Sequence, residues 1–338
     1  MTPKQRIDYI DLAKGLCILL VISNHIDLGE FLYKNEHVSS FFFSFRMPLY
    51  YMLSGLFLSI KDNNYFDFVQ KKINRLIVPF VFFVTITNIY SFIKHTITHS
   101  DFIYSSPLLF LFRENSYGLM NNPLWFLFSL FTTYMLYAAL HYLFHGKKTY
   151  IYAGTVLCGC IGYFLGKMHI NIPFYLDTSL TCLPFVTMGS IIRNETNLLY
   201  GKMSKSFCIG SAAILFLITF FLCGDTGSIF TINSYDCNIL SLFVTGILGS
   251  TSILLICKAI NKLLIISYMG RYSIIVLGVH DIFRIEFGAL IREYITNVII
   301  YEFILMFIVV VLSLLSIYIL KRFFPCFVAQ KDFIYFNR

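Results

Sequence analysis

Long apolar runs recur along this 338-residue chain, and they constrain its fold more than any other feature. A helix needs about 20 mainly apolar residues to cross the hydrocarbon core of a bilayer, with a range of about 17–25. On that scale the sequence contains ten candidate spans. They are residues 9–28, 38–60, 76–94, 123–144, 150–166, 178–192, 206–223, 237–257, 268–285 and 297–320. We therefore predict an all-α integral membrane protein, a bundle of about ten transmembrane helices.

Composition supports this prediction and excludes several classes of protein. Hydrophobic residues make up 57% of the chain, and only 13% of residues are charged, against about 25% in a typical soluble domain. A water-soluble protein of this size cannot hide so much apolar surface. Secreted disulfide scaffolds, collagens, disordered tails and soluble nucleic-acid binders are excluded. We expect membrane lipids around the chain and no nucleic-acid partner.

The basic residues predict the orientation of the chain in the membrane. Short loops rich in lysine and arginine stay in the cytoplasm, and most of the 26 such residues fall on one side of the predicted spans. Both termini are therefore predicted to face the cytoplasm. The stretch 103–112 is too short to cross, so we expect an outer loop or a re-entrant segment there. No linker separates a second domain, and residues 1–338 are predicted to form one membrane domain.

Metal and disulfide chemistry have no support in the sequence. The nine cysteines include no C-x-x-C pair, and the closest approach is Cys158-Gly-Cys160 inside an apolar run. Cysteines at membrane depth are typically small buried hydrophobic residues. No H-x-x-x-H or H-E-x-x-H spacing brings metal ligands together. We expect no metal site.

The first predicted span carries ionisable side chains, which are costly in hydrocarbon and usually functional. Lys14 and His25 are eleven residues apart, and at about 100° per residue they fall within about 20° of each other on one helix face, about 16 Å apart along the axis. Asp11 precedes Lys14 by three residues and is predicted to pair with it. The alternatives are that Asp11 and Lys14 reach the interface and that His25 lies at a solvated helix end.

The ninth predicted span repeats this pattern. His280 lies about ten residues, or roughly 15 Å, into the span, and Asp281 follows it directly. A neutral imidazole with a carboxylate partner can accept and return a proton. The alternative is a structural histidine bonded to a neighbouring helix.

Two further features lie in and after the second span. Pro48 and the pair Ser54-Gly55 are typical of a kink and of close helix approach. The basic cluster 71–75 is expected at the inner face. It is either ordinary topology-setting charge or a docking point for a phosphorylated ligand.

Six short motifs resemble those of the membrane acyltransferase-3 family, and they occur in the order in which that family has them. They are Asp11-Leu12-Ala13-Lys14-Gly15 followed by His25; Met47 through Gly55; Lys72-x-x-Arg75; Leu124-Trp125-Phe126-Leu127; Asp177-Thr178-Ser179-Leu180 through Pro184-Phe185; and Gly270-Arg271-Tyr272-Ser273 followed by His280. Each motif is weak alone, but six in order over nearly the whole chain are specific. Lys14 and Lys72 stand where arginine is commoner in the family, and lysine is the poorer bidentate partner for phosphate.

The resemblance implies a membrane O-acyltransferase of the stand-alone sugar O-acetyltransferase type. Its donor is an acyl-CoA, usually acetyl-CoA, which binds from the cytoplasm as a substrate. The resemblance assigns the CoA phosphates to Lys72 and Arg75. His25 is then the general base on the acceptor hydroxyl, or a transient acyl carrier, and Lys14, oriented by Asp11, stabilises charge or positions the thioester.

The resemblance also implies an acceptor and a location. We expect a cell-surface or lipid-linked carbohydrate as acceptor, and the bacterial inner membrane as location. His280 is a second candidate proton acceptor or orients the acceptor sugar. Tyr50, Tyr51 and Trp125 are candidates for stacking on a sugar face, although Trp125 also fits an interfacial anchor. The competing interpretation is a proton-coupled transporter or flippase for a sugar-containing solute.

Overall fold

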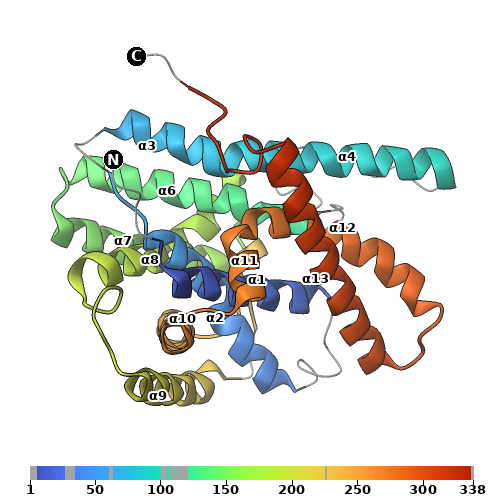
Figure 1. Ribbon diagram of the computed structural model, residues 1–338. Helices are drawn as coiled ribbons and strands as arrows, with labels where there is room; N and C mark the ends of the chain where they lie inside the picture. The colour runs from blue at the N-terminus through green and yellow to red at the C-terminus, as the bar shows by residue number, and fades with distance from the viewer. Residues whose placement is uncertain are drawn as a thin grey trace. The chain divides into compact units, whose positions relative to one another are not determined.

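Helices make up most of the computed structural model, which describes residues 6–26, 35–60, 64–99, 104, 106, 111, 121–224 and 227–335. Within these residues ten helices have 18 or more residues, and each coincides with one predicted span. They are α1 (Asp8–His25), α2 (Glu36–Gly55), α4 (Val78–Thr98), α6 (Trp125–Leu143), α7 (Lys148–Lys167), α8 (Leu176–Glu195), α9 (Lys205–Cys223), α10 (Ile239–Ile260), α12 (Ser273–Arg292) and α13 (Val298–Phe323) (Figure 1). The predicted stretch 103–112 lies largely outside the described residues.

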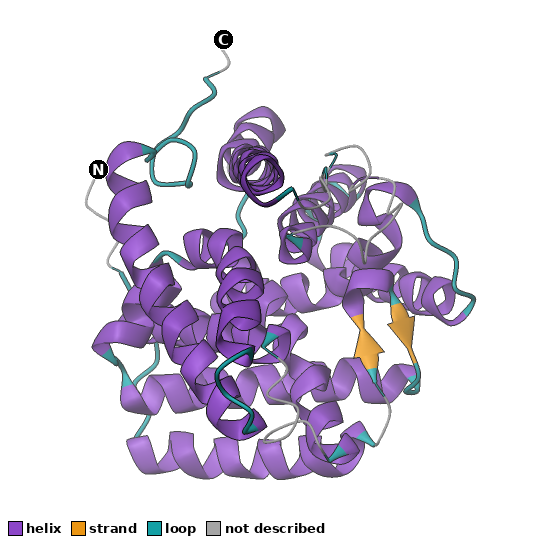
Figure 2. Cartoon of the chain, turned by 90° about the vertical axis from the view of Figure 1, so that its right-hand side faces the viewer, coloured by secondary structure: helices purple, strands orange, loops and turns teal. Residues whose placement is uncertain are grey.

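Shorter elements connect these helices. The helical ones are α3 (Tyr65–Lys72), η2 (Ile73–Ile77), η3 (Asn122–Leu124), η4 (Pro173–Tyr175), η5 (Phe230–Ile232) and α11 (Leu264–Arg271). Two strands of two residues each, β1 (Ser228–Ile229) and β2 (Ser234–Tyr235), pair as a small ribbon (Figure 2). The predicted all-α character is therefore confirmed.

Six helical segments among the described residues are long and apolar enough to cross a membrane. They are residues 65–98, 122–143, 148–167, 205–223, 239–260 and 298–323. The remaining long helices, α1, α2, α8 and α12, carry more polar residues, and most of the predicted catalytic and acceptor-binding residues lie on them. A multi-pass membrane protein follows from the apolar helices, whereas ten spans and cytoplasmic termini stay predictions.

Asparagine and serine side chains begin five of these helices. Asn35 Oδ1 accepts from the backbone N–H groups of the first turn of α2. Asn64, Ser204, Asn238 and Asn297 do the same for α3, α9, α10 and α13. Such caps satisfy N–H groups that have no partner within the helix, so the sequence fixes where each helix begins.

Two boundaries differ from those predicted. The helix that contains the third predicted span begins before residue 76, because α3, η2 and α4 run as one continuous helix over residues 65–98 (Figure 1). Its first two turns are too polar to appear as an apolar run. The ninth span, in turn, is two helices, because the chain leaves helical geometry at Tyr272, between α11 and α12.

The chain divides into two compact units. Unit 1 comprises residues 1–58, 185–229 and 235–273, and unit 2 comprises residues 59–184, 230–234 and 274–338. In unit 1, α9 lies alongside α10 and α1 packs on α11. The single membrane domain over residues 1–338 stays a prediction.

Glycines allow helices to approach closely within unit 1. A Cβ on Gly15 of α1 would overlap the Ile266 carbonyl of α11, and a Cβ on Gly270 of α11 would overlap the Asp11 carbonyl of α1. The α2–α8 contact is similar, since a Cβ on Gly55 would overlap the Val186 carbonyl. Small residues at such contacts are typical of membrane helix packing. The close-approach role predicted for Gly55 is confirmed.

Candidate active site

Helix α1 of unit 1 carries Lys14 and His25 in one unbroken helical run. The helical phase that places them on one face therefore applies to the folded chain. Both side chains are half-buried. The Lys14 ammonium lies 5.4 Å from the centroid of the Phe57 ring, near the end of α2, which is a cation–π distance.

The carboxylate of Asp11 has a partner that the sequence does not predict. The sequence predicts a pair with Lys14, and in the structure Asp11 accepts from Arg6, at 2.5 Å from Nε and 3.2 Å from Nη2. Arginine holds a carboxylate with two parallel bonds, which lysine cannot do. The direct ion pair between Asp11 and Lys14 stays a prediction.

A second cation shares the aromatic partner of Lys14. The Arg193 guanidinium of α8 lies 5.8 Å from the Phe57 ring centroid and donates to the Leu56 carbonyl at 3.2 Å. Two cations thus approach one ring within unit 1. Sequence analysis missed Arg193, because only folding brings the end of α8 beside the end of α2.

The predicted acceptor-binding tyrosines are buried in α2. Tyr51 is fully buried and Tyr50 is 7% exposed. Tyr50 interacts through its hydroxyl with Ser273, so the structure joins the second and sixth sequence motifs inside unit 1. Buried rings of this kind contribute mainly to packing. Sugar stacking by Tyr50 and Tyr51 stays a prediction, and the structure gives Tyr51 no exposed face for it.

In unit 2 the predicted donor-binding residues lie on a helix and not in a loop. Lys72 ends α3, and its Nζ lies 3.4 Å from the Tyr134 ring centroid and 5.2 Å from that of Phe68. Arg75 lies in η2, a π-helical turn. It donates to the Ala329 carbonyl and pairs with Asp332 at 3.5 Å. The two cations therefore contact different parts of unit 2.

Trp125 begins α6 and is 5% exposed. Its ring centroid is 5.8 Å from that of the buried Tyr175. The ring is packed within unit 2, so the structure supports neither an exposed sugar-stacking role nor an interfacial anchor. The acceptor role of Trp125 stays a prediction.

His280 is fully buried in α12, and its hydrogen bonds define its tautomer. Nδ1 lies 2.9 Å from the Val276 carbonyl oxygen and 3.0 Å from that of Leu277. Carbonyl oxygens only accept, so Nδ1 must carry the proton, and in the neutral ring Nε2 is the acceptor nitrogen. An imidazole held in this way presents a basic nitrogen.

The carboxylate beside His280 has another partner. The sequence predicts that Asp281 is the carboxylate partner of the His280 imidazole. In the structure its Oδ1 accepts from Arg284 Nε at 2.7 Å, one helical turn along α12. The backbone carbonyls take the place predicted for Asp281 at the imidazole. Successive residues on a helix point about 100° apart, which is why sequence adjacency misled the prediction.

Asn121 is a buried amide that sequence analysis did not single out. It is fully buried, and its Nδ2 donates to Thr87 Oγ1 at 3.1 Å and to the Gly278 carbonyl at 2.8 Å. Asn121 thereby links α4 to α12, and its contact on α12 is Gly278, two residues before His280. The only feature of the sequence that could have pointed to Asn121 is its position just before the Leu124-Trp125 motif.

Comparison with known proteins identifies the family. A family model described as an acyltransferase domain matches residues 7–321. No curated protein and no solved structure matches the chain significantly. The matched segment includes every residue proposed above for catalysis or binding. The chain therefore belongs to the acyltransferase-3 family of membrane proteins.

Proposed function

We propose that this protein transfers an acyl group, in the simplest case acetyl, from acyl-CoA to a hydroxyl of a cell-surface or lipid-linked carbohydrate. The observation that carries the proposal is the family match over residues 7–321, which includes His25 and the basic cluster 71–75. The proposal also places the protein in the bacterial inner membrane. Membership of the family supports acyltransferase activity. The identity of the donor, the identity of the acceptor and the location in the bacterial inner membrane are parts of our proposal.

In the proposed reaction His25 is the general base. Its imidazole takes the proton of the acceptor hydroxyl, and the oxygen attacks the thioester carbonyl carbon. The new C–O bond forms, the C–S bond breaks, and the CoA thiolate leaves and recovers the proton from His25. Lys14 lies about 16 Å from His25 along the axis of α1, so we assign it the positioning of the pantetheine arm of the donor and not a contact with the reacting carbonyl. Its half-buried position beside Phe57 strengthens a polar contact with that arm, because water screens it less.

Thiol release tests the proposed activity. Purified protein incubated with acetyl-CoA and a candidate glycan is expected to liberate free CoA thiol and to add an acetyl mass to the glycan. A transporter or flippase moves solute without thiol release, and that outcome would refute the proposal. A single equivalent of thiol released without acceptor would instead indicate an acyl-enzyme, and loss of that burst in a His25 variant would identify His25 as the carrier.

Lys72 and Arg75 are proposed to bind the phosphates of the donor. Each of the charge reversals Lys72→Glu and Arg75→Glu is expected to raise the donor KM at least tenfold, since one charge-assisted hydrogen bond contributes about 1.5–3 kcal/mol. The acceptor KM should change little. Steady-state kinetics with each substrate varied in turn measures both constants. An unchanged donor KM would mean that these residues only set topology.

His280 is proposed as the second proton acceptor, through Nε2. An asparagine there retains a donor for the Val276 and Leu277 carbonyls but removes the basic nitrogen. His280→Asn is therefore expected to lower kcat about a hundredfold, at the low end of general-base effects, while the melting temperature stays close to that of the wild type. A retained kcat would show that His280 is not a proton acceptor, and a lowered melting temperature with retained kcat would assign it a structural role.

A further inference from the structure

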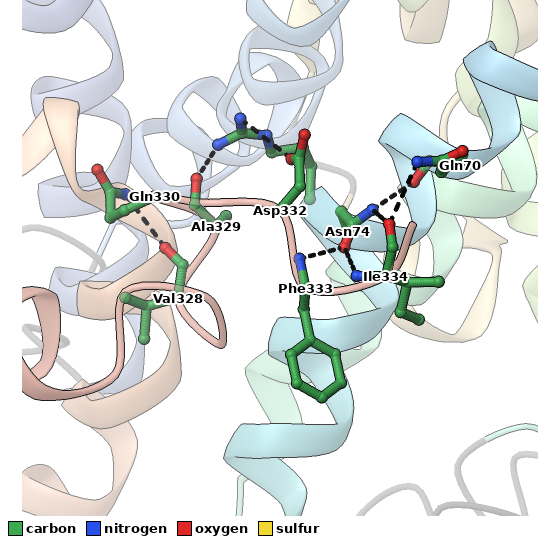
Figure 3. A network of polar contacts seen from close by, with 9 residues as sticks. Gln70, Asn74, Val328, Ala329, Gln330, Asp332, Phe333 and Ile334 are labelled. Carbon is green, nitrogen blue, oxygen red and sulfur yellow. Dashed lines mark hydrogen bonds and ion pairs between the residues drawn. The ribbon is translucent and has the colours of Figure 1, made fainter. Parts of the chain in front are cut away.

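The C-terminal strap, residues 324–335, is firmly docked within unit 2. Asn74, which is 1% exposed, accepts from the Phe333 and Ile334 N–H groups at 2.8 and 2.7 Å and donates to the Ile334 carbonyl at 2.8 Å (Figure 3). Gln70 donates to the same carbonyl at 3.2 Å. One buried amide thus holds the strap backbone by both its donor and its acceptor.

Apolar contacts hold the other half of the strap. The Phe327 ring stacks on Phe82 of α4 at 5.3 Å between centroids and lies 4.8 Å from the Phe333 ring. Val328 is fully buried and Ala329 nearly so. The strap therefore has a fixed course along η2 and α4.

This course brings the strap onto Arg75. The guanidinium donates to the Ala329 carbonyl, and Asp332 lies 3.5 Å from Nη2. The two side chains remain 47% and 35% exposed, although Asp332 Oδ1, the atom that faces Nη2, is itself buried. At 3.5 Å, and with both side chains partly exposed, the pair is weak. The docking also occurs at a π-helical turn, a feature found frequently at functional sites.

The strap lies beyond the residues that match the family model, which end at 321. It is therefore not part of the pattern by which the family is recognised. A carboxylate on Arg75 occupies the same donor groups that a phosphate would use, because a guanidinium recognises both anions in the same fork geometry.

We propose that Asp332 is an internal counter-ion that competes with the anionic acyl donor for Arg75, and that Asn74 is the positioning residue that holds the strap in the competing place. The proposal rests on the proposed function, in which Arg75 binds a donor phosphate. Donor binding then exchanges the Asp332 carboxylate for a phosphate oxygen, with no covalent step. The strap lowers donor affinity and so sets the donor concentration at which the enzyme works.

Equilibrium binding of radiolabelled CoA to the full-length protein in detergent tests this proposal. Asp332→Asn is expected to tighten CoA binding about two- to fivefold, the range that an exposed ion pair supports, and Asp332→Glu to restore the wild-type value. Asn74→Leu should tighten binding similarly, because the strap loses its tether. Glu293→Gln is the matched control, since it removes the same charge in the connection before α13, a 26-residue helix about 39 Å long that lies between Glu293 and the strap in the chain.

A double-mutant cycle separates the possible outcomes. Asp332→Asn is expected to have no effect in an Arg75→Gln background. If Arg75→Gln leaves CoA binding unchanged, the donor-binding role of Arg75 in the proposed function is wrong, and the competition fails with it. If Arg75→Gln weakens binding but Asp332→Asn leaves it unchanged or weaker, only the competition is refuted. In that case the strap helps to hold Arg75 for the donor.

Discussion

Replacement of His25 by asparagine is expected to abolish measurable acyl transfer, with thiol release falling at least a hundredfold. General acid–base catalysis typically contributes 10²–10⁴-fold, and asparagine cannot accept the proton. His25 is the last residue of α1 and is half-buried, so asparagine is expected to fit without repacking. The measurement is thiol release from acetyl-CoA at saturating acceptor.

His169→Asn is the matched control for this experiment. His169 is exposed and has a positive φ of 53°, a conformation that asparagine tolerates well. Its replacement should leave thiol release at the wild-type rate. Both variants should elute as the wild type on size exclusion in detergent. Wild-type turnover by His25→Asn would remove His25 from the mechanism and leave His280 as the candidate base.

Gly270→Ala is expected to destabilise the protein by about 1–3 kcal/mol, the usual cost of overpacking a well-packed core. The added methyl group overlaps the backbone carbonyl of Asp11, which cannot rotate away as a side chain would. Helices α1 and α11 must therefore separate, and Lys14 moves with α1. A lower melting temperature in detergent, together with reduced thiol release, is the expected result.

Gly210→Ala provides a chemically identical control. A Cβ on Gly210 of α9 meets no atom within 4 Å. Because alanine favours a helix over glycine by about 0.5–1 kcal/mol, this variant should melt at or slightly above the wild-type temperature. If the Gly270→Ala and Gly210→Ala variants have the same melting temperature, α1 and α11 do not pack as closely as described.

The helices could be predicted because each depends on local sequence. The predicted spans 206–223 and 237–257 lie close to Lys205–Cys223 and Ile239–Ile260, since an apolar run bounded by polar residues defines its own limits. The helix over residues 65–98 was missed in part. Its first turns follow the Asn64 cap and are polar. A search for apolar runs therefore does not detect this part of the helix.

The site could be predicted only as a set of candidate residues. Lys14 and His25 share a helix, and their relation follows from helical geometry. The partners of other groups depend on contacts between distant segments, as with Arg193 beside Phe57 and Asn74 beneath the strap. The arginine partners of Asp11 and Asp281 were not predicted, although a guanidinium binds a carboxylate strongly wherever one comes within reach.

The pairing of α1 with α11 has a consequence for how the protein is made. Gly15 packs against Ile266, and about 250 residues must be synthesised between them. At about 5–20 residues per second, α1 emerges about 12–50 s before its partner exists. During that interval α1, which carries charged residues, cannot yet pack on α11. The packing of unit 1 is therefore completed only late in translation. In chains that terminate before residue 264, the side of α1 that packs on α11 should stay uncovered, although α2 and α10 can still pack on α1, and such chains should be targets for membrane quality control.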